Sequence, residues 1–250
     1  MLWQILVEFL FRLACGLAAA MTFTSPTRVT SGFFRVHLWV GMGFNTFIAV
    51  VVVLINDFPQ RTSVMSISIA ASILSYIGAV VWLYEKSTLG RWILGAVTTV
   101  NFLGALVASA APPAWKVLDV FTASLLLGST FAAMLLGHWY LNTPTMKLTP
   151  LKQLILVMGL AVILRTLLAG TELAEFTPRW QQEGSSYMAM LTLRWLTGIV
   201  GVLAMIVMTW QTLRIPNTQS ATGILYVAVI FVFLGELTSQ LLSAPSLHPV

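Results

Sequence analysis

Residues 2–21 read LWQILVEFLFRLACGLAAAM, a stretch of twenty in which Gln4, Glu8 and Arg12 are the strongly polar residues. A helix rises 1.5 Å per residue, so twenty residues cover the ~30 Å hydrocarbon core of a bilayer. The stretch lacks a basic start and runs on into another apolar segment, so we interpret it as a retained transmembrane helix and not as a cleaved signal peptide. A charge near the bilayer centre costs at least ~2.5–3.5 kcal/mol, so Glu8 and Arg12 need a structural or chemical reason.

The same pattern recurs along all 250 residues. Hydrophobic residues make up 58% of the chain and charged residues 8%, with a mean hydropathy of +0.90, which excludes an ordinary soluble domain. Apolar runs of about twenty residues indicate helices, whereas a barrel shows ten-residue alternation. We predict an all-α, polytopic membrane bundle that forms a single integral-membrane domain over residues 1–250. Its eight helices are expected near residues 2–21, 33–55, 64–84, 92–111, 117–140, 154–169, 188–210 and 223–242.

The charges of the connecting loops predict the orientation in the membrane. Loops after the odd-numbered helices hold seven basic residues: Arg28, Arg35, Lys86, Arg91, Lys147, Lys152 and Arg214. Loops after the even-numbered helices hold three, Arg61, Lys116 and Arg179, with most loop acids: Asp57, Asp119, Glu172, Glu175 and Glu183. Because basic loops stay inside, both termini are expected on the non-cytoplasmic side of a bacterial-type inner membrane. The net charge of +5 is therefore assigned to orientation and anionic lipid, with no nucleic-acid partner.

Five charged residues lie well inside the predicted spans: Glu8, Arg12, Arg165, Arg194 and Glu236. The predicted topology puts all five in the outer half of the membrane, with a summed charge of +1. Glu8 precedes Arg12 by four residues, the favourable orientation for a helical ion pair. Gln240 lies one turn beyond Glu236 on the last helix. We expect a shared polar site at this depth.

Two interpretations of this polar site stay open. The charges can serve only as ties between the first, sixth, seventh and eighth helices, because intramembrane ion networks join helices. Alternatively they line a pocket for a quinol that enters sideways from lipid. A carboxylate there accepts a proton from the quinol hydroxyl, and arginine hydrogen bonds hold the carbonyl form.

Two histidines sit at matching depth near the cytoplasmic ends of their helices, His37 on the second and His138 on the fifth. Imidazoles from two helices at equal depth are what a bis-histidine b-type haem requires. Gly41 lies one turn from His37 on the same face as Asn45, which leaves room for a flat macrocycle. The alternative is that each histidine is an interfacial hydrogen-bonding residue. The single cysteine, Cys15, excludes a disulfide framework and a thiolate metal cluster, and no other metal site is predicted.

The last helix carries Phe233-Leu234-Gly235-Glu236-Leu237. Together with eight helices and outward termini, this string resembles the membrane anchors of the DMSO-reductase and NrfD/polysulfide-reductase type. The resemblance covers the topology and this one string, and a separate family is the other interpretation. It implies a quinol-interacting subunit of a multi-protein oxidoreductase, with Glu236 as the equivalent of a quinol-site residue.

Three functions follow as hypotheses. The first is a membrane subunit of a quinone-linked electron-transfer complex, quinol-oxidising or non-catalytic, with quinone and one b haem as cofactors and other protein subunits as partners. The second is a proton-coupled transporter or channel lined by the five charges. Their confinement to one half of the bilayer and the lack of an inverted repeat count against it. The third is a structural or assembly subunit of a membrane complex.

Overall fold

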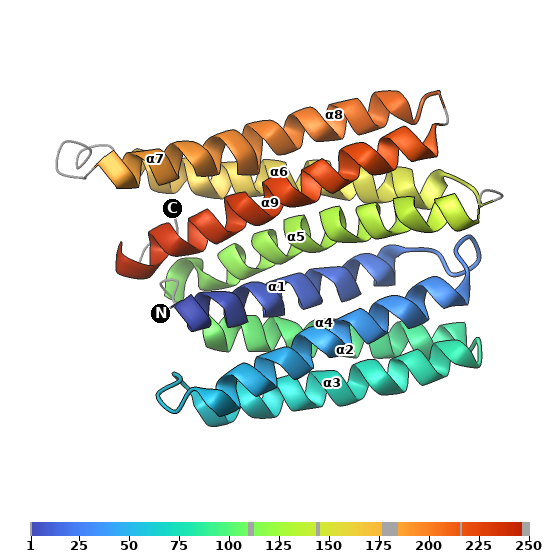
Figure 1. The fold of residues 1–250 in the computed structure, drawn as a ribbon, viewed down its shortest axis with the longest axis horizontal. Coiled ribbons are helices and arrows are strands. Elements are labelled where there is room, and N and C mark those ends of the chain that lie inside the picture. Colours follow the sequence, from blue (N-terminus) through green and yellow to red (C-terminus); the bar gives the residue numbers. More distant parts are fainter. Residues whose placement is uncertain (1, 110–112, 144–145, 177–184, 216, 247–250) are drawn as a thin grey trace.

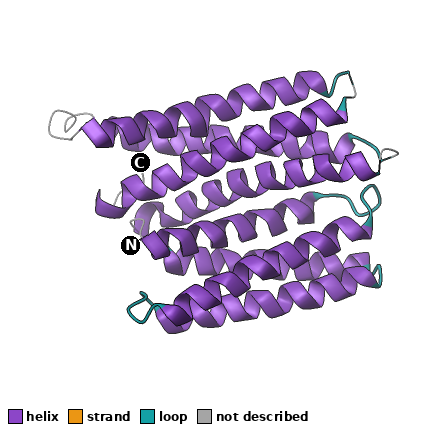
Figure 2. Ribbon diagram, in the orientation of Figure 1, coloured by secondary structure: helices purple, strands orange, loops and turns teal. Residues whose placement is uncertain are grey.

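The computed structural model describes residues 2–109, 113–143, 146–176, 185–215 and 217–246. Helices account for nearly all of them (Figures 1 and 2): α1 Leu2–Phe23, α2 Ser31–Leu54, α3 Arg61–Leu83, α4 Ser87–Ala108, α5 Pro113–Asn142, α6 Thr149–Phe176, α7 Ser185–Leu193, η2 Arg194–Gly201, α8 Val202–Thr212 and α9 Thr218–Ser246. Segments α7, η2 and α8 follow one another without a break and form one span, Ser185–Thr212. Eight helices in the described chain are therefore long and apolar enough to cross a membrane, which confirms the predicted all-α architecture and its eight spans.

Most helices begin before their predicted starts, by five residues in α4, α6 and α9, and the sixth and seventh spans show the most informative differences. Helix α6 begins five residues before the predicted start at Leu154, because Pro150 is accepted in a first helical turn, where its missing N–H has no partner to lose. It also continues to Phe176, so Glu172 and Glu175 belong to a helix and not to a loop. Within the seventh span, Arg194–Gly201 is wound as a π-helix, a form that sequence periodicity does not predict.

Helices α1 and α5 form the middle of the bundle. Helix α1 packs on α2, α4 and α5, while α5 packs on α6 and α9, so the pair separates an α2–α3–α4 layer from the α6–α9 layer (Figure 1). Their backbones touch at Gly16 and Gly128: a Cβ added to Gly16 would lie 1.8 Å from the carbonyl oxygen of Ser124. Glycine is required at this crossing because any side chain would force the two helices apart.

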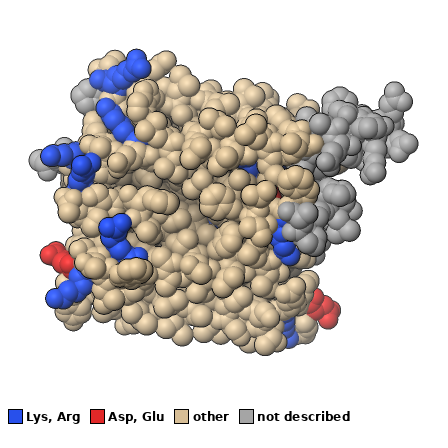
Figure 3. Space-filling model, turned by 180° about the vertical axis from the view of Figure 1, so that it is seen from behind, with Lys and Arg blue, Asp and Glu red and all other residues tan. Residues whose placement is uncertain are grey.

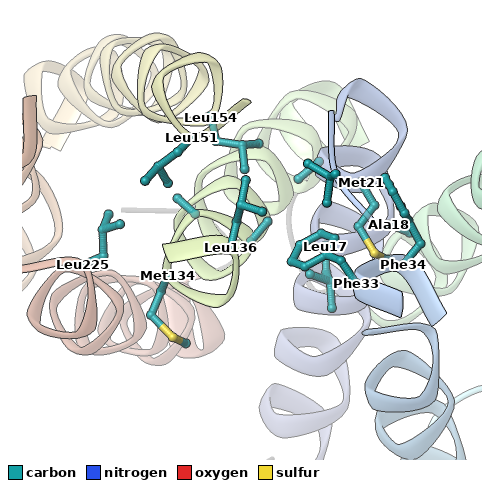
Figure 4. Close-up of a cluster of buried hydrophobic side chains, with 14 of the residues drawn as sticks. Leu17, Ala18, Met21, Phe33, Phe34, Met134, Leu136, Leu151, Leu154 and Leu225 are labelled. Carbon is teal, nitrogen blue, oxygen red and sulfur yellow. The ribbon is translucent and has the colours of Figure 1, made fainter. Parts of the chain in front are cut away.

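The main apolar core lies toward the end of the bundle opposite the termini. It joins α1, α2, α5, α6 and α9 (Figure 4), and includes Leu17, Met21, Phe33, Leu136, Leu154 and Leu225. Within it, Phe34 stacks on Trp82 with ring centroids 4.1 Å apart. The buried charges described below lie toward the other end of the bundle, among two smaller apolar clusters.

The two ends of the bundle differ in charge. Most of the described basic loop residues lie at the end away from the termini, which Figure 3 shows at its left edge. Arg61 and Lys116 belong to the opposite end, here called the terminal end; Arg179, Glu183 and His248 lie outside the described residues. The described residues therefore show the unequal distribution of basic loop residues on which the predicted orientation depends. The end with more of them is called the basic end below.

Candidate functional site

A chain of buried ion pairs crosses the bundle near its terminal end. It runs through Glu8 and Arg12 on α1, Asp119 on α5, Arg165 on α6 and Glu236 on α9. Each of these residues is at most 5% exposed. The four helices that supply them adjoin one another around α5, so residues more than 200 positions apart in sequence share one network.

The geometry of the network is specific. The Nη2 atom of Arg12 donates to Glu8 within the same helix and to Oδ2 of Asp119 at 2.5 Å. The other carboxylate oxygen of Asp119 accepts from Nη1 of Arg165 at 2.5 Å. Arg165 donates two hydrogen bonds to Glu236, from Nε to Oε1 and from Nη2 to Oε2, both at 2.8 Å. Such a fork-to-fork pair fixes both side chains and is stronger than a single contact.

Asp119 was predicted to be a loop acid, and this prediction is wrong. It is 2% exposed, nearly two turns inside α5, and each of its oxygens binds a different arginine. The one sequence signal for its burial is weak, since Asp119 lies only two residues inside the predicted fifth span, 117–140. With Asp119 included, the five connected residues alternate in sign and sum to −1, whereas the predicted set summed to +1.

Four of the five predicted intramembrane charges are members of the network, and Arg194 lies beside it. Arg194 is 3% exposed and is the first residue of the π-helical segment. This segment crosses α9 closely, since a Cβ on Gly235 would lie 2.3 Å from Cα of Gly198. Farther along, Leu191 packs with Leu242. These two contacts set an antiparallel register that brings Arg194 level with residues 239–240 of α9, one turn from Glu236.

Several buried polar atoms at this end have no hydrogen-bond partner within the described chain. Both amide atoms of Gln240, Oε1 and Nε2, are without one, and so are Nε1 of Trp195 and Nε and Nη1 of Arg12. Gln240 is 6% exposed and follows Glu236 by four residues, so both side chains lie on one face of α9. A buried amide without partners costs ~1–3 kcal/mol unless a ligand or water satisfies it. The region therefore has unused donors and an acceptor suited to a molecule with carbonyl and hydroxyl groups.

The two histidines turn toward different neighbours. His37 is 4% exposed, bonds the carbonyl of Phe33 through Nδ1 at 2.6 Å, and packs against the rings of Phe33 and Trp139. His138 is exposed, and its Nδ1 lies 3.3 Å from the hydroxyl of Tyr226 on α9. Because Trp139 and His138 are consecutive on α5, they point about 100° apart. The buried His37–Gly41–Asn45 face of α2 lies against α3, where Ser75 Oγ is 3.9 Å from a Cβ added to Gly41. The haem pair stays a prediction.

The fold and the ion network define the class of the protein as a polytopic α-helical bundle with a buried, interhelical ionic site and eight helices able to span a membrane. The chain matches no protein-family model, no curated protein and no solved structure.

Proposed function

We propose that the protein is the membrane subunit of a quinone-linked redox complex, and that the quinone ring binds at the terminal end between η2 and α9, beside Glu236. The observation that carries the proposal is the buried amide of Gln240, which has no partner and lies one turn from Glu236. An amide offers both a donor and an acceptor, so it suits the carbonyl of a quinone and the hydroxyl of a quinol alike. The indole N–H of Trp195, also without a partner, supplies a second donor near this level.

The chemistry assigned to the site is quinol oxidation. Two O–H bonds of the quinol break, two protons leave through Glu236 to water at the terminal end, and two electrons pass to a redox centre of a partner subunit. Glu236 can take a proton without leaving Arg165 unpaired, because Arg165 also binds Asp119. The π-helical segment supports the same location, since π-turns are frequent at functional sites.

The test is quinone binding by purified protein. Calorimetric titration with a short-chain ubiquinone should give a measurable Kd for wild type, and quinone should be extractable from the preparation. Gln240→Leu should weaken binding at least tenfold, and Glu236→Gln and Arg194→Ala should abolish quinol turnover in the assembled complex. Gln219→Leu, an exposed change on the same helix, is the matched control. Absence of any quinone binding by wild type rejects the function, whereas wild-type affinity in Gln240→Leu and normal turnover in the Glu236 and Arg194 variants reject the site.

A b-type haem held by His37 and His138 is a separate part of the proposal, and it would require His138 to turn away from Tyr226 toward α2. Because Nδ1 of His37 bonds the carbonyl of Phe33, Nε2 would be the ring atom free to hold the haem iron. An oxidised-minus-reduced absorbance spectrum should show a Soret band, and His37→Ala and His138→Ala should each remove it. A featureless spectrum rejects the haem and leaves the quinone site untouched.

A second candidate function, a structural subunit whose charges only fasten helices, is favoured by the closure of the network. Both oxygens of Asp119 and of Glu236 bind arginine nitrogens, which is how a tie between helices satisfies its charges. In that case Glu236→Gln lowers stability, and wild type and Gln240→Leu fail alike to bind quinone.

A further inference from the structure

A groove separates α6 from α8 on the outside of the bundle. It encloses about 530 Å³ and is lined by apolar side chains of both helices, among them Leu156, Ile163 and Val207. These three side chains are more than half exposed. Gly159, midway along the α6 wall, faces open space, since a Cβ there would meet nothing within 4 Å. The groove therefore opens sideways, where a membrane-embedded bundle meets lipid tails.

The groove is not apolar throughout. Trp210, Gln211 and Arg214 line it where α8 ends at the basic end of the bundle. Lys152 precedes Leu156 by four residues and so lies on the same face of α6, one turn nearer that end. Tryptophan and arginine at this level are typical of the headgroup region. The groove thus has basic residues at its end near the basic end of the bundle and apolar side chains along the rest of its length.

We propose that this groove is a binding site for one anionic phospholipid, with its phosphate between Arg214 and Lys152 and an acyl chain lying over Gly159 toward Ile163. From Leu156 to Ile163 the helix rises about 10 Å, which covers most of the ~15 Å half-thickness of the hydrocarbon core. Charge complementarity selects an anionic headgroup, because each basic residue near the membrane surface attracts such a lipid about fivefold. The site is independent of the proposed quinone function and lies in the opposite half of the bundle.

Two glycines provide a matched steric test. Gly159→Leu fills the groove, while Gly43→Leu adds the same side chain at similar depth on α2, where a Cβ also meets nothing within 4 Å. Both proteins are purified in detergent, supplied with equal amounts of phosphatidylglycerol and phosphatidylcholine, and examined by native mass spectrometry. One phosphatidylglycerol should remain bound to wild type and to Gly43→Leu, and its occupancy should fall at least tenfold in Gly159→Leu.

A second pair of variants tests the headgroup without touching the packed helices. Arg214→Gln and Lys152→Gln should each lower phosphatidylglycerol retention about fivefold and leave phosphatidylcholine unchanged. Equal retention by the two glycine variants would mean ordinary annular lipid only. Equal loss of both lipids in Arg214→Gln would show that the charge of Arg214 does not select the lipid. Release of a second copy or of a partner protein by Gly159→Leu would show that the groove is a protein interface. Any of these three results overturns the proposal.

Discussion

Arg165 and Glu236 are joined by two parallel hydrogen bonds of 2.8 Å although 71 residues separate them in sequence. The pair locks α6 to α9, and the remaining guanidinium nitrogen of Arg165 extends the connection to Asp119 on α5. Three helices are therefore fixed by one side chain.

Replacing Arg165 with lysine keeps the charge and removes the fork. A lysine ammonium cannot match both oxygens of Glu236 and also reach Asp119, so the free energy of unfolding should fall by roughly 3 kcal/mol. Denaturation in mixed micelles, followed by circular dichroism, measures this change. Arg28→Lys, at an exposed loop position, should have no effect. Equal stabilities of the two variants would contradict a role for the fork.

Asp119→Asn should be the most damaging single neutralisation in the network. It leaves both Arg12 and Arg165 without one anionic partner, whereas Glu8→Gln leaves Arg12 bound to Asp119. Removing one partner of a buried pair costs about 3–5 kcal/mol. The same denaturation assay should rank Asp119→Asn below Glu8→Gln, with Asp57→Asn, at an exposed loop acid, unchanged from wild type. The reverse order of the first two variants would show that Asp119 is not the bridge.

Adding one methyl group at the α1–α5 crossing should separate the two central helices. In Gly128→Ala the new Cβ would lie 1.8 Å from the carbonyl carbon of Gly16, and neither backbone can rotate away. We expect a loss of about 3 kcal/mol or more, or failure to accumulate folded protein. Gly43→Ala, which adds the same methyl group in open space, controls for the change itself. Fluorescence-detected size exclusion reports folded yield, and indistinguishable profiles would argue against the close contact.

Side-specific labelling tests the predicted orientation. In a Cys15→Ser background, Thr27→Cys lies at the basic end and Asn56→Cys at the terminal end, and both positions are exposed. If basic loops stay in the cytoplasm, a membrane-impermeant maleimide applied to whole cells should label Asn56→Cys and spare Thr27→Cys until the cells are lysed. Labelling with the opposite pattern would place both termini inside.

The helices could be predicted from the sequence because the thickness of the bilayer core sets the length of an apolar run that crosses it. Each of the eight predicted spans overlaps one of the eight candidate membrane-spanning helices. The sequence was also sufficient for four members of the ion network, since a charge in an apolar run is conspicuous. Asp119 was missed because it stands near the start of a span, where an acid is ordinarily solvated, and only the packing of α5 between α1 and α6 shows its burial. The π-helical winding after Leu193 and the partner-free amide of Gln240 depend on tertiary contacts that no local pattern encodes.

The order of the charges along the chain bears on how the protein enters a membrane as it is synthesised. Glu8 and Arg12 neutralise each other within the first helix, before any other span exists. Asp119 is synthesised next and can pair with Arg12. Arg165 follows and can pair with Asp119, and Glu236 is synthesised last and can pair with Arg165. We expect each newly inserted member of the network to meet an opposite charge that is already embedded, so that cotranslational insertion does not leave that member isolated in lipid.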